Sequence, residues 1–248
     1  MGEPFAILHG VRFLLACILA AGSGFWSLGA PGEMQLFPLS DASRPELPGS
    51  DADSKALNEM LGGSTGPRLR WNSAPQLKVL VSVMEYRNGN SEYVATGEQL
   101  TEEEIAKLVE DLTEGLGLMT ANTFESFAAV EREVVAPGAT APVSQPNRIV
   151  VGRFNGVQKL LGTIGLGGRK SRADGTITSG AIILDSAYDR TSPKRHLLRT
   201  HELGHALGYN HVQSRASIMN PSIGSEINTF DRKAVLLAFG ATPPVAMR

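Results

Sequence analysis

Three histidines and a glutamate lie in one short stretch of this chain, and their spacing restricts how the stretch can fold. His201 and His205 are four residues apart, so a helix presents both imidazoles on one face. Glu202 lies about 100° further round that helix, beside anything that the two histidines hold. His211 can reach the same point only if the helix ends first, and Gly208 permits such a turn. The pattern predicts a helix, a sharp turn and a meeting point for three imidazoles.

Three neutral imidazoles are the ligands of a catalytic zinc ion, because they leave the fourth tetrahedral position open for water. We expect one Zn²⁺, held by His201, His205 and His211. Zinc lowers the pKa of its bound water towards ~7, and Glu202 is then placed to act as the general base. The activated water would attack a carbonyl carbon, and Glu202 would pass the proton to the leaving amine. The chemistry indicated is hydrolysis of an amide bond.

The stretch is followed by Ser-Ile-Met-Asn-Pro at residues 217–221, and together the two segments resemble the metzincin clan of metallopeptidases with its Met-turn. Met219 comes eight residues after His211, and this short gap resembles the matrixin family, the M10 type of peptidase. The resemblance implies that Met219 forms an apolar floor beneath the zinc without binding it. It also implies that Leu166, on an edge strand, and Leu197 contact an extended peptide substrate.

The fold implied by this resemblance is an α+β zincin-like catalytic domain. Its sheet would be twisted, mostly parallel and five-stranded, with an antiparallel edge strand. Its helices would be one early helix, the active-site helix and a C-terminal helix. The hydrophobic pattern agrees and places Thr101 and Glu104 in a capping box at the start of the early helix. It predicts strands near residues 77–84, 127–135, 148–154, 164–167 and 181–184, and later helices that begin near Ser192 and Thr229.

The sequence departs from the matrixin pattern at three places. Matrixins usually carry a pro-segment cysteine that blocks the zinc, but the one cysteine here is Cys17, so that form of latency is excluded. No histidine lies between Phe154 and Asp185 to hold a structural zinc, so a single ion is expected. Pro221 stands where astacins and serralysins have a tyrosine ligand, so the site is expected to have three histidine ligands.

The N-terminal part predicts export. Residues 1–30 have Arg12 before an apolar run and small residues after it, which is typical of a signal peptide. The alternative is an uncleaved membrane anchor, because residues 13–30 approach the length of a membrane helix. Residues 31–68 are rich in proline and acidic side chains and are predicted to be a linker or a pro-segment. The catalytic domain would then occupy residues 69–248, in a protein that is secreted, periplasmic or extracellular, or anchored to a membrane.

The composition narrows the possible partners. A net charge of −2 gives no basic surplus, so nucleic acid is not expected as a partner. The glycine-rich stretch at residues 162–171 matches neither a P-loop nor the GxGxxG pattern of dinucleotide sites. We expect a monomer that binds polypeptide and contacts a membrane only if the N-terminal segment is retained.

The sequence therefore predicts a zinc-dependent endopeptidase that hydrolyses peptide bonds of extended polypeptides, through a zinc-bound water activated by Glu202. Two alternatives stay open. One is a non-catalytic, zinc-stabilised domain that binds peptides, and the other is a zinc amidase that acts on a non-peptide substrate.

Overall fold

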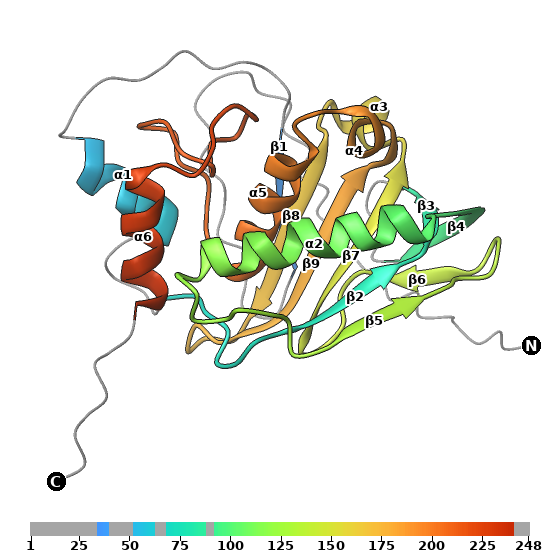
Figure 1. Ribbon diagram of the computed structural model, residues 1–248, viewed down its shortest axis with the longest axis horizontal. Helices are drawn as coiled ribbons and strands as arrows, with labels where there is room; N and C mark the ends of the chain where they lie inside the picture. The colour runs from blue at the N-terminus through green and yellow to red at the C-terminus, as the bar shows by residue number, and fades with distance from the viewer. Residues whose placement is uncertain (1–33, 40–51, 63–67, 88–91, 241–248) are drawn as a thin grey trace, which may run out of the picture.

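The computed structural model describes residues 34–39, 52–62, 68–87 and 92–240. In these residues the chain has the mixed α+β fold that the sequence predicts (Figure 1). It contains one nine-stranded sheet and six helices. The predicted signal segment at residues 1–30 and the predicted turn at Asn88 and Gly89 lie outside the described residues. Among the described helices, none has both the length and the apolar character needed to cross a membrane.

The strands come in groups separated by single helices, and three helices follow the last strand. The strands are β1 (Gln35–Leu39), β2 (Gln76–Leu80), β3 (Ser82–Glu85), β4 (Glu92–Gln99), β5 (Val130–Glu133), β6 (Thr140–Pro142), β7 (Arg148–Asn155), β8 (Gly165–Ser171) and β9 (Ile177–Asp185). The helices are α1 (Ala52–Leu61), α2 (Glu102–Met119), α3 (Val157–Leu161), α4 (Ser186–Thr191), α5 (Arg195–Leu207) and α6 (Thr229–Phe239).

The sheet order is β1-β8-β9-β7-β3-β4-β6, and β2 pairs with both β7 and β5. Strands β5, β2, β7 and β9 run parallel to one another, and β8 is antiparallel to β9. The sheet thus has nine strands rather than the expected five. The antiparallel strand β8 is not the edge, because β1 pairs along its outer side.

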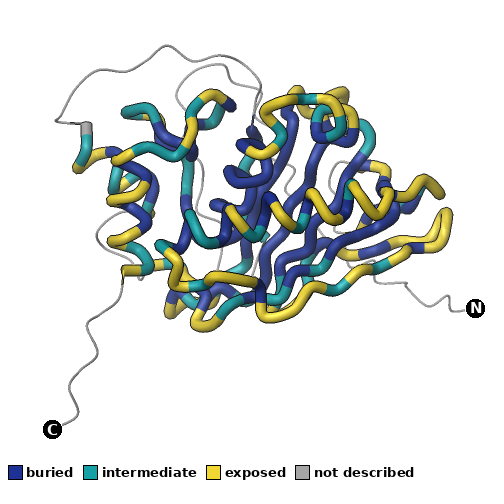
Figure 2. The backbone as a smooth tube through the Cα atoms, in the orientation of Figure 1, coloured by how far each residue is buried: buried dark blue, intermediate teal, exposed yellow. Residues whose placement is uncertain are grey.

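Side chains of successive strand residues point to opposite faces of the sheet, and this alternation separates two hydrophobic cores. Ile182 and Leu184 of β9 pack in the larger core with residues of α2, α5 and α6. Ala181 and Ile183 pack in the smaller core with Phe154. In Figure 1, α2 and α5 cover the same face of the sheet, and Figure 2 shows α5 almost wholly buried. The helix that carries the histidines is therefore held between the sheet and α2.

The helix starts follow the capping signals with two shifts. The helix predicted to begin near Ser192 is α5, which begins at Arg195, whereas Ser192 is the C-cap of α4. Thr101 accepts a hydrogen bond from the Glu104 amide, and the Glu104 side chain accepts one from the Thr101 amide, so the predicted capping box of α2 is confirmed. Helix α6 starts at the predicted place, but its N-cap is Asn228 rather than Thr229. Asn228 caps because its side-chain oxygen reaches the amides of Phe230 and Asp231.

The linker or pro-segment predicted over residues 31–68 contains two packed elements, so the folded core starts before residue 69. Leu39 of β1 and Met60 of α1 are fully buried in the larger core. Glu59 of α1 also accepts hydrogen bonds from the backbone amides of Gln213 and Ser214, at 2.7 and 3.0 Å. The proline-rich composition conceals these elements because each is short and is stabilised by contacts with distant parts of the chain.

Candidate metal centre

Helix α5 ends where the sequence predicts its end, at Gly208. This residue is the C-cap and has a φ of 121°, a conformation that side-chain-bearing residues rarely adopt. A Cβ at this position would also lie 2.7 Å from the carbonyl oxygen of Leu69, so the turn passes close to another part of the backbone. Beyond the turn, the chain brings His211 back towards His201 and His205.

The three imidazoles meet at one point. Nε2 of His201 lies 3.0 Å from Nε2 of His205 and 3.3 Å from Nε2 of His211. Two nitrogen ligands of a tetrahedral zinc, each at ~2.0 to 2.1 Å from the ion, are about 3.3 Å apart. The spacing of the ring nitrogens therefore fits one zinc ion held by three histidines.

The opposite ring nitrogens fix the orientation of two of these ligands. Nδ1 of His201 lies 2.6 Å from the carbonyl oxygen of Ile218, and Nδ1 of His205 lies 2.9 Å from that of Tyr209. A carbonyl oxygen can only accept, so each Nδ1 carries the proton and each Nε2 offers its lone pair inward.

Burial keeps all three rings neutral. It lowers the pKa of His201 to about 4 and holds the pKa values of His205 and His211 well below their ordinary value. Neutral imidazole is the form that binds a metal ion. The triad is therefore in its metal-binding state at neutral pH without any change in the protein.

Glu202 is completely buried, and no side chain of the described residues donates a hydrogen bond to its carboxylate, beside which lies the backbone of Gly167. Burial raises the pKa of this carboxyl well above its usual range. A buried carboxylate without a partner is costly, so such a group calls for a functional explanation. If a zinc ion were held by the three histidines, a water molecule in its open position would be such a partner.

Two glycines of β8 allow the sheet to approach Glu202. A Cβ at Gly165 would lie 2.6 Å from Oε1 of Glu202, and a Cβ at Gly167 would lie 2.8 Å from its Cα. Real Cβ atoms essentially never come so close to other atoms. Strand β8 and the part of α5 that carries Glu202 can therefore pack at this separation only because both positions are glycine.

Met219 lies beneath the helix turn that carries the first two histidines. It is fully buried, and a Cβ at Gly204 of α5 would come within 2.5 Å of its Sδ atom. The Met219 carbonyl oxygen accepts a hydrogen bond of 2.8 Å from the amide of Val212, the residue after His211. The turn that contains Met219 is thus tied to the segment that supplies the third histidine.

Asp231 of α6 supports this turn, and the sequence analysis did not find its role. Its buried carboxylate accepts hydrogen bonds from the amides of Ile218 and Asn228, at 3.1 and 3.0 Å, and from the hydroxyl of Ser217. The sequence shows an aspartate in the first turn of a helix, where its side chain can cap the helix start. It does not show that the same carboxylate reaches back to the Met-turn.

Arg169 is a second residue that the sequence analysis missed. Its buried guanidinium donates to the carbonyl oxygens of His205 and Tyr209, at 3.2 and 3.0 Å, and to Oδ1 of Asn210 at 2.6 Å. Burial lowers the pKa of Arg169 to about 9. Strand β8 therefore holds the end of α5 and the turn towards His211 through one side chain.

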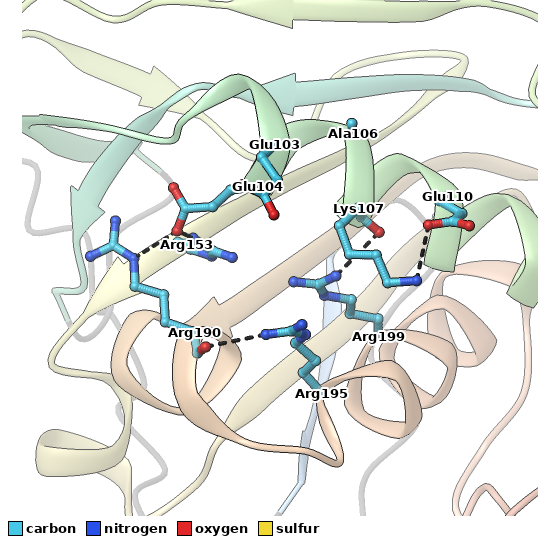
Figure 3. A pocket seen from close by; sticks show the side chains of 9 residues that line it. All are labelled: Glu103, Glu104, Ala106, Lys107, Glu110, Arg153, Arg190, Arg195 and Arg199. Carbon is cyan, nitrogen blue, oxygen red and sulfur yellow. Dashed lines mark hydrogen bonds and ion pairs between the residues drawn. The ribbon is translucent and has the colours of Figure 1, made fainter.

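A buried ion network fixes the first half of α5. Arg199, two residues before His201, donates to Asp189 of α4 and Asp111 of α2, each at 2.7 Å, and Arg153 of β7 also donates to Asp189 at 2.7 Å. Arg153 and Arg199 also line a neighbouring pocket, which has a volume of about 590 Å³. Figure 3 shows the side chains around it. None of the three histidines nor Glu202 lines this pocket, so it is separate from the metal centre.

The two predicted substrate contacts lie in different environments. Leu197 is buried in the larger core, which also contains Leu39 and Ile223. Leu166 is buried in the smaller core with Ile183, on the other face of the sheet. The structure thus brings the histidines and Glu202 together, whereas Leu166 lies near them only through its backbone. Contact of Leu166 and Leu197 with substrate stays a prediction.

Comparison with known families agrees with this geometry over part of the chain. The matrixin model of the M10 peptidases matches residues 154–236, a span that includes β8, β9, α5 and the Met-turn. A comparison with curated proteins finds no match. The matrixin match and the histidine cluster support a zinc-dependent metallopeptidase of the matrixin type.

Proposed function

We propose that this protein is a zinc endopeptidase that cleaves extended polypeptides at the centre formed by His201, His205, His211 and Glu202. The observation that carries the proposal is the pairing of a complete histidine triad with a fully buried carboxylate that has no side-chain partner among the described residues. A structural zinc site has four protein ligands and no need for such a carboxylate. A hydrolytic site needs three ligands and a base.

In the proposed reaction, Glu202 transfers the proton, and the carbonyl oxygens of Ile218 and Tyr209 hold two of the histidine rings. When bound, zinc activates a water molecule and polarises the carbonyl group of the scissile bond. Glu202 takes the proton from the attacking water and delivers it to the nitrogen of the leaving amine. Because burial raises its pKa, the protonated carboxyl is stable between these two transfers. Ile218 and Tyr209 keep the rings of His201 and His205 in place through their carbonyl oxygens.

Strand β8 is the natural place for the substrate backbone. Its glycines lie against Glu202, and an extended peptide paired with its outer side would run past the metal centre. Leu197, on the same helix as the ligands, is proposed to contact the substrate side chain that follows the scissile bond. The proposed partner is an unfolded or extended polypeptide, bound by a monomeric enzyme that is exported or anchored by its N-terminal segment.

The test is turnover of a peptide library by the zinc-loaded full chain, before and after removal of the metal by a chelator. We expect cleavage that is lost with the metal and restored by added Zn²⁺. Full zinc occupancy without cleavage of any peptide would contradict the proposal and favour a non-catalytic binding domain. Hydrolysis of small amides without cleavage of any peptide would favour the amidase.

A further inference from the structure

Strand β1 already occupies the place proposed for the substrate. It pairs antiparallel with β8 over its full length, from Gln35 opposite Arg169 to Leu39 opposite Gly165. In Figure 1, β1 lies beside β8 and next to α5. We propose that Gln35–Leu39 is an internal peptide ligand of the cleft, which competes with substrates until it is displaced. This inference rests on the proposed function, because it assigns the same cleft.

The register places alternate side chains of β1 towards the catalytic helix. Phe37 pairs with Gly167 and Leu39 pairs with Gly165, and side chains of paired residues lie on the same face of a sheet. Atoms built onto those two glycines would meet Glu202. Phe37 and Leu39 therefore point to the side of β8 on which the general base lies.

Phe37 covers two of the metal ligands. Its ring stacks on that of His205, with centroids 4.5 Å apart and planes at 11°, and meets the ring of His211 edge-on at 5.8 Å. The guanidinium of Arg169 lies 4.9 Å from the centroid of the same phenyl ring. Phe37 thus fills the space beside the triad through which a substrate side chain would pass.

Leu39 anchors the other end of the strand. Its side chain is fully buried in the core that contains Leu197 and Leu198 of α5. Its carbonyl oxygen accepts hydrogen bonds from the Ile164 amide, at 2.8 Å, and from the Thr163 hydroxyl. Backbone pairing with side chains placed in alternate pockets is how a sheet edge binds an extended peptide.

The covalent connection makes β1 a strong competitor. Helix α1, which follows β1 in the chain, is fixed to the domain by Glu59 and by the carbonyl oxygen of Met60, which accepts from the Asn210 amide at 2.9 Å. A tethered segment has an effective concentration on the order of 1 mM. Free peptide substrates bind enzymes with KM values of roughly 1 μM to 1 mM. The internal strand therefore excludes all but tightly bound or concentrated substrates.

The rival explanation is that β1 is a permanent part of the sheet that merely protects the edge of β8. The two explanations differ in whether an added peptide can take its place. The test uses the zinc-loaded full chain with Glu202→Gln, so that the probe is not hydrolysed. The probe is a fluorescent peptide with the sequence of residues 34–39, Met-Gln-Leu-Phe-Pro-Leu, and its dissociation constant is measured by anisotropy.

Two variants weaken the internal strand in different ways. Phe37→Ala removes the ring over His205, and Leu39→Asp places a carboxylate in the apolar pocket. Leu160→Ala is the matched control, because Leu160 is apolar, 56% exposed and far along the chain in α3. Hydrogen exchange of the Ile164 amide reports directly on β1, since this amide donates to Leu39.

We expect weak probe binding by the parent and the control, and binding that is tighter by on the order of tenfold or more in at least one of the two strand variants. The Ile164 amide should exchange faster in that variant and become protected again when the probe is added. Equal probe binding in parent, control and both variants, or an Ile164 amide that stays protected in both variants, would overturn the inference. Because the readout is binding, an inactive enzyme that passes this test would contradict the proposed function and leave the internal ligand standing.

Discussion

The carbonyl oxygen of Ile218 lies 2.6 Å from Nδ1 of His201, so the turn that contains Met219 fixes the orientation of a ring on α5. The amide of the same Ile218 donates to Asp231 of α6 at 3.1 Å. Helix α6 therefore orients the ring of His201, a proposed metal ligand, through two successive hydrogen bonds. Contacts of this kind, one step beyond the ligands, set the geometry and the basicity of a metal site.

Asp231→Ala should weaken zinc binding although Asp231 touches no proposed ligand. The change leaves two backbone amides and the Ser217 hydroxyl without their acceptor, at a cost of roughly 1–3 kcal/mol for each buried group. We expect zinc affinity to fall by about 10- to 100-fold, measured by competition with a chromophoric chelator. Asp174→Ala, at an exposed turn, is the control. An unchanged affinity in Asp231→Ala would show that the turn does not orient His201.

Gly167→Ala should separate β8 from α5. The added methyl group would lie 2.8 Å from the Cα atom of Glu202, and a backbone atom cannot move away as a flexible side chain can. Overpacking of this kind costs about 1–3 kcal/mol, so we expect a lower melting temperature and reduced peptide turnover.

Gly224→Ala is the matched control for Gly167→Ala, because a Cβ at Gly224 would meet no atom within 4 Å. Its stability should be unchanged or slightly raised, since alanine restricts the unfolded chain more than glycine does. If both alanine variants have the same melting temperature and turnover, neither stability nor activity depends on the close approach of β8 to Glu202.

In the metal-free protein, the contribution of His201 to the free energy of unfolding should be lost as the pH falls from about 6.5 to 4. Burial lowers the pKa of His201 to about 4 in the folded state, so the unfolded chain takes up this proton first. The contribution is complete above pH 6.5 and amounts to about 3 kcal/mol. The pKa of Glu202 is raised by burial and acts in the opposite direction, so the measurement must isolate His201.

Urea unfolding of the metal-free parent and of His201→Gln at several pH values provides that isolation. The difference in unfolding free energy between the two should shrink as the pH falls through this range. His196→Gln is the control for the loss of a histidine, because the His196 side chain is 49% exposed and lies outside the triad. If the difference in unfolding free energy between the parent and His201→Gln is the same at every pH, His201 is not neutral and buried as described.

Much of the metal centre could be predicted because its geometry is local. The spacing of His201 and His205 on a helix and the turn at Gly208 depend on backbone rules that a short segment obeys by itself. The capping box at Thr101 is equally local and appears as predicted. Strands β7 and β9 were found because their buried residues form long apolar runs.

The missed features depend on contacts between distant parts of the chain. Arg169 reaches the end of α5, and Asp231 reaches the Met-turn, but neither contact leaves a pattern in the neighbouring sequence. Strand β1 contains Pro38, which weighs against a strand, and it exists because β8 offers an edge for it. The count of nine strands was missed for the same reason, since short strands such as β6 are defined by their partners.

The most direct test of the metal centre is Glu202→Ala, with zinc content and peptide turnover measured on the same preparation. About one zinc per chain is expected, as in the parent, because the three histidines are untouched. Stability should change little, since no side chain of the described residues compensates the cost of burying the Glu202 carboxylate. Turnover should drop by at least ~10²- to 10⁴-fold, the contribution of a general base. Zinc retained together with turnover at the parental rate would contradict the role given to Glu202 and the mechanism that depends on it.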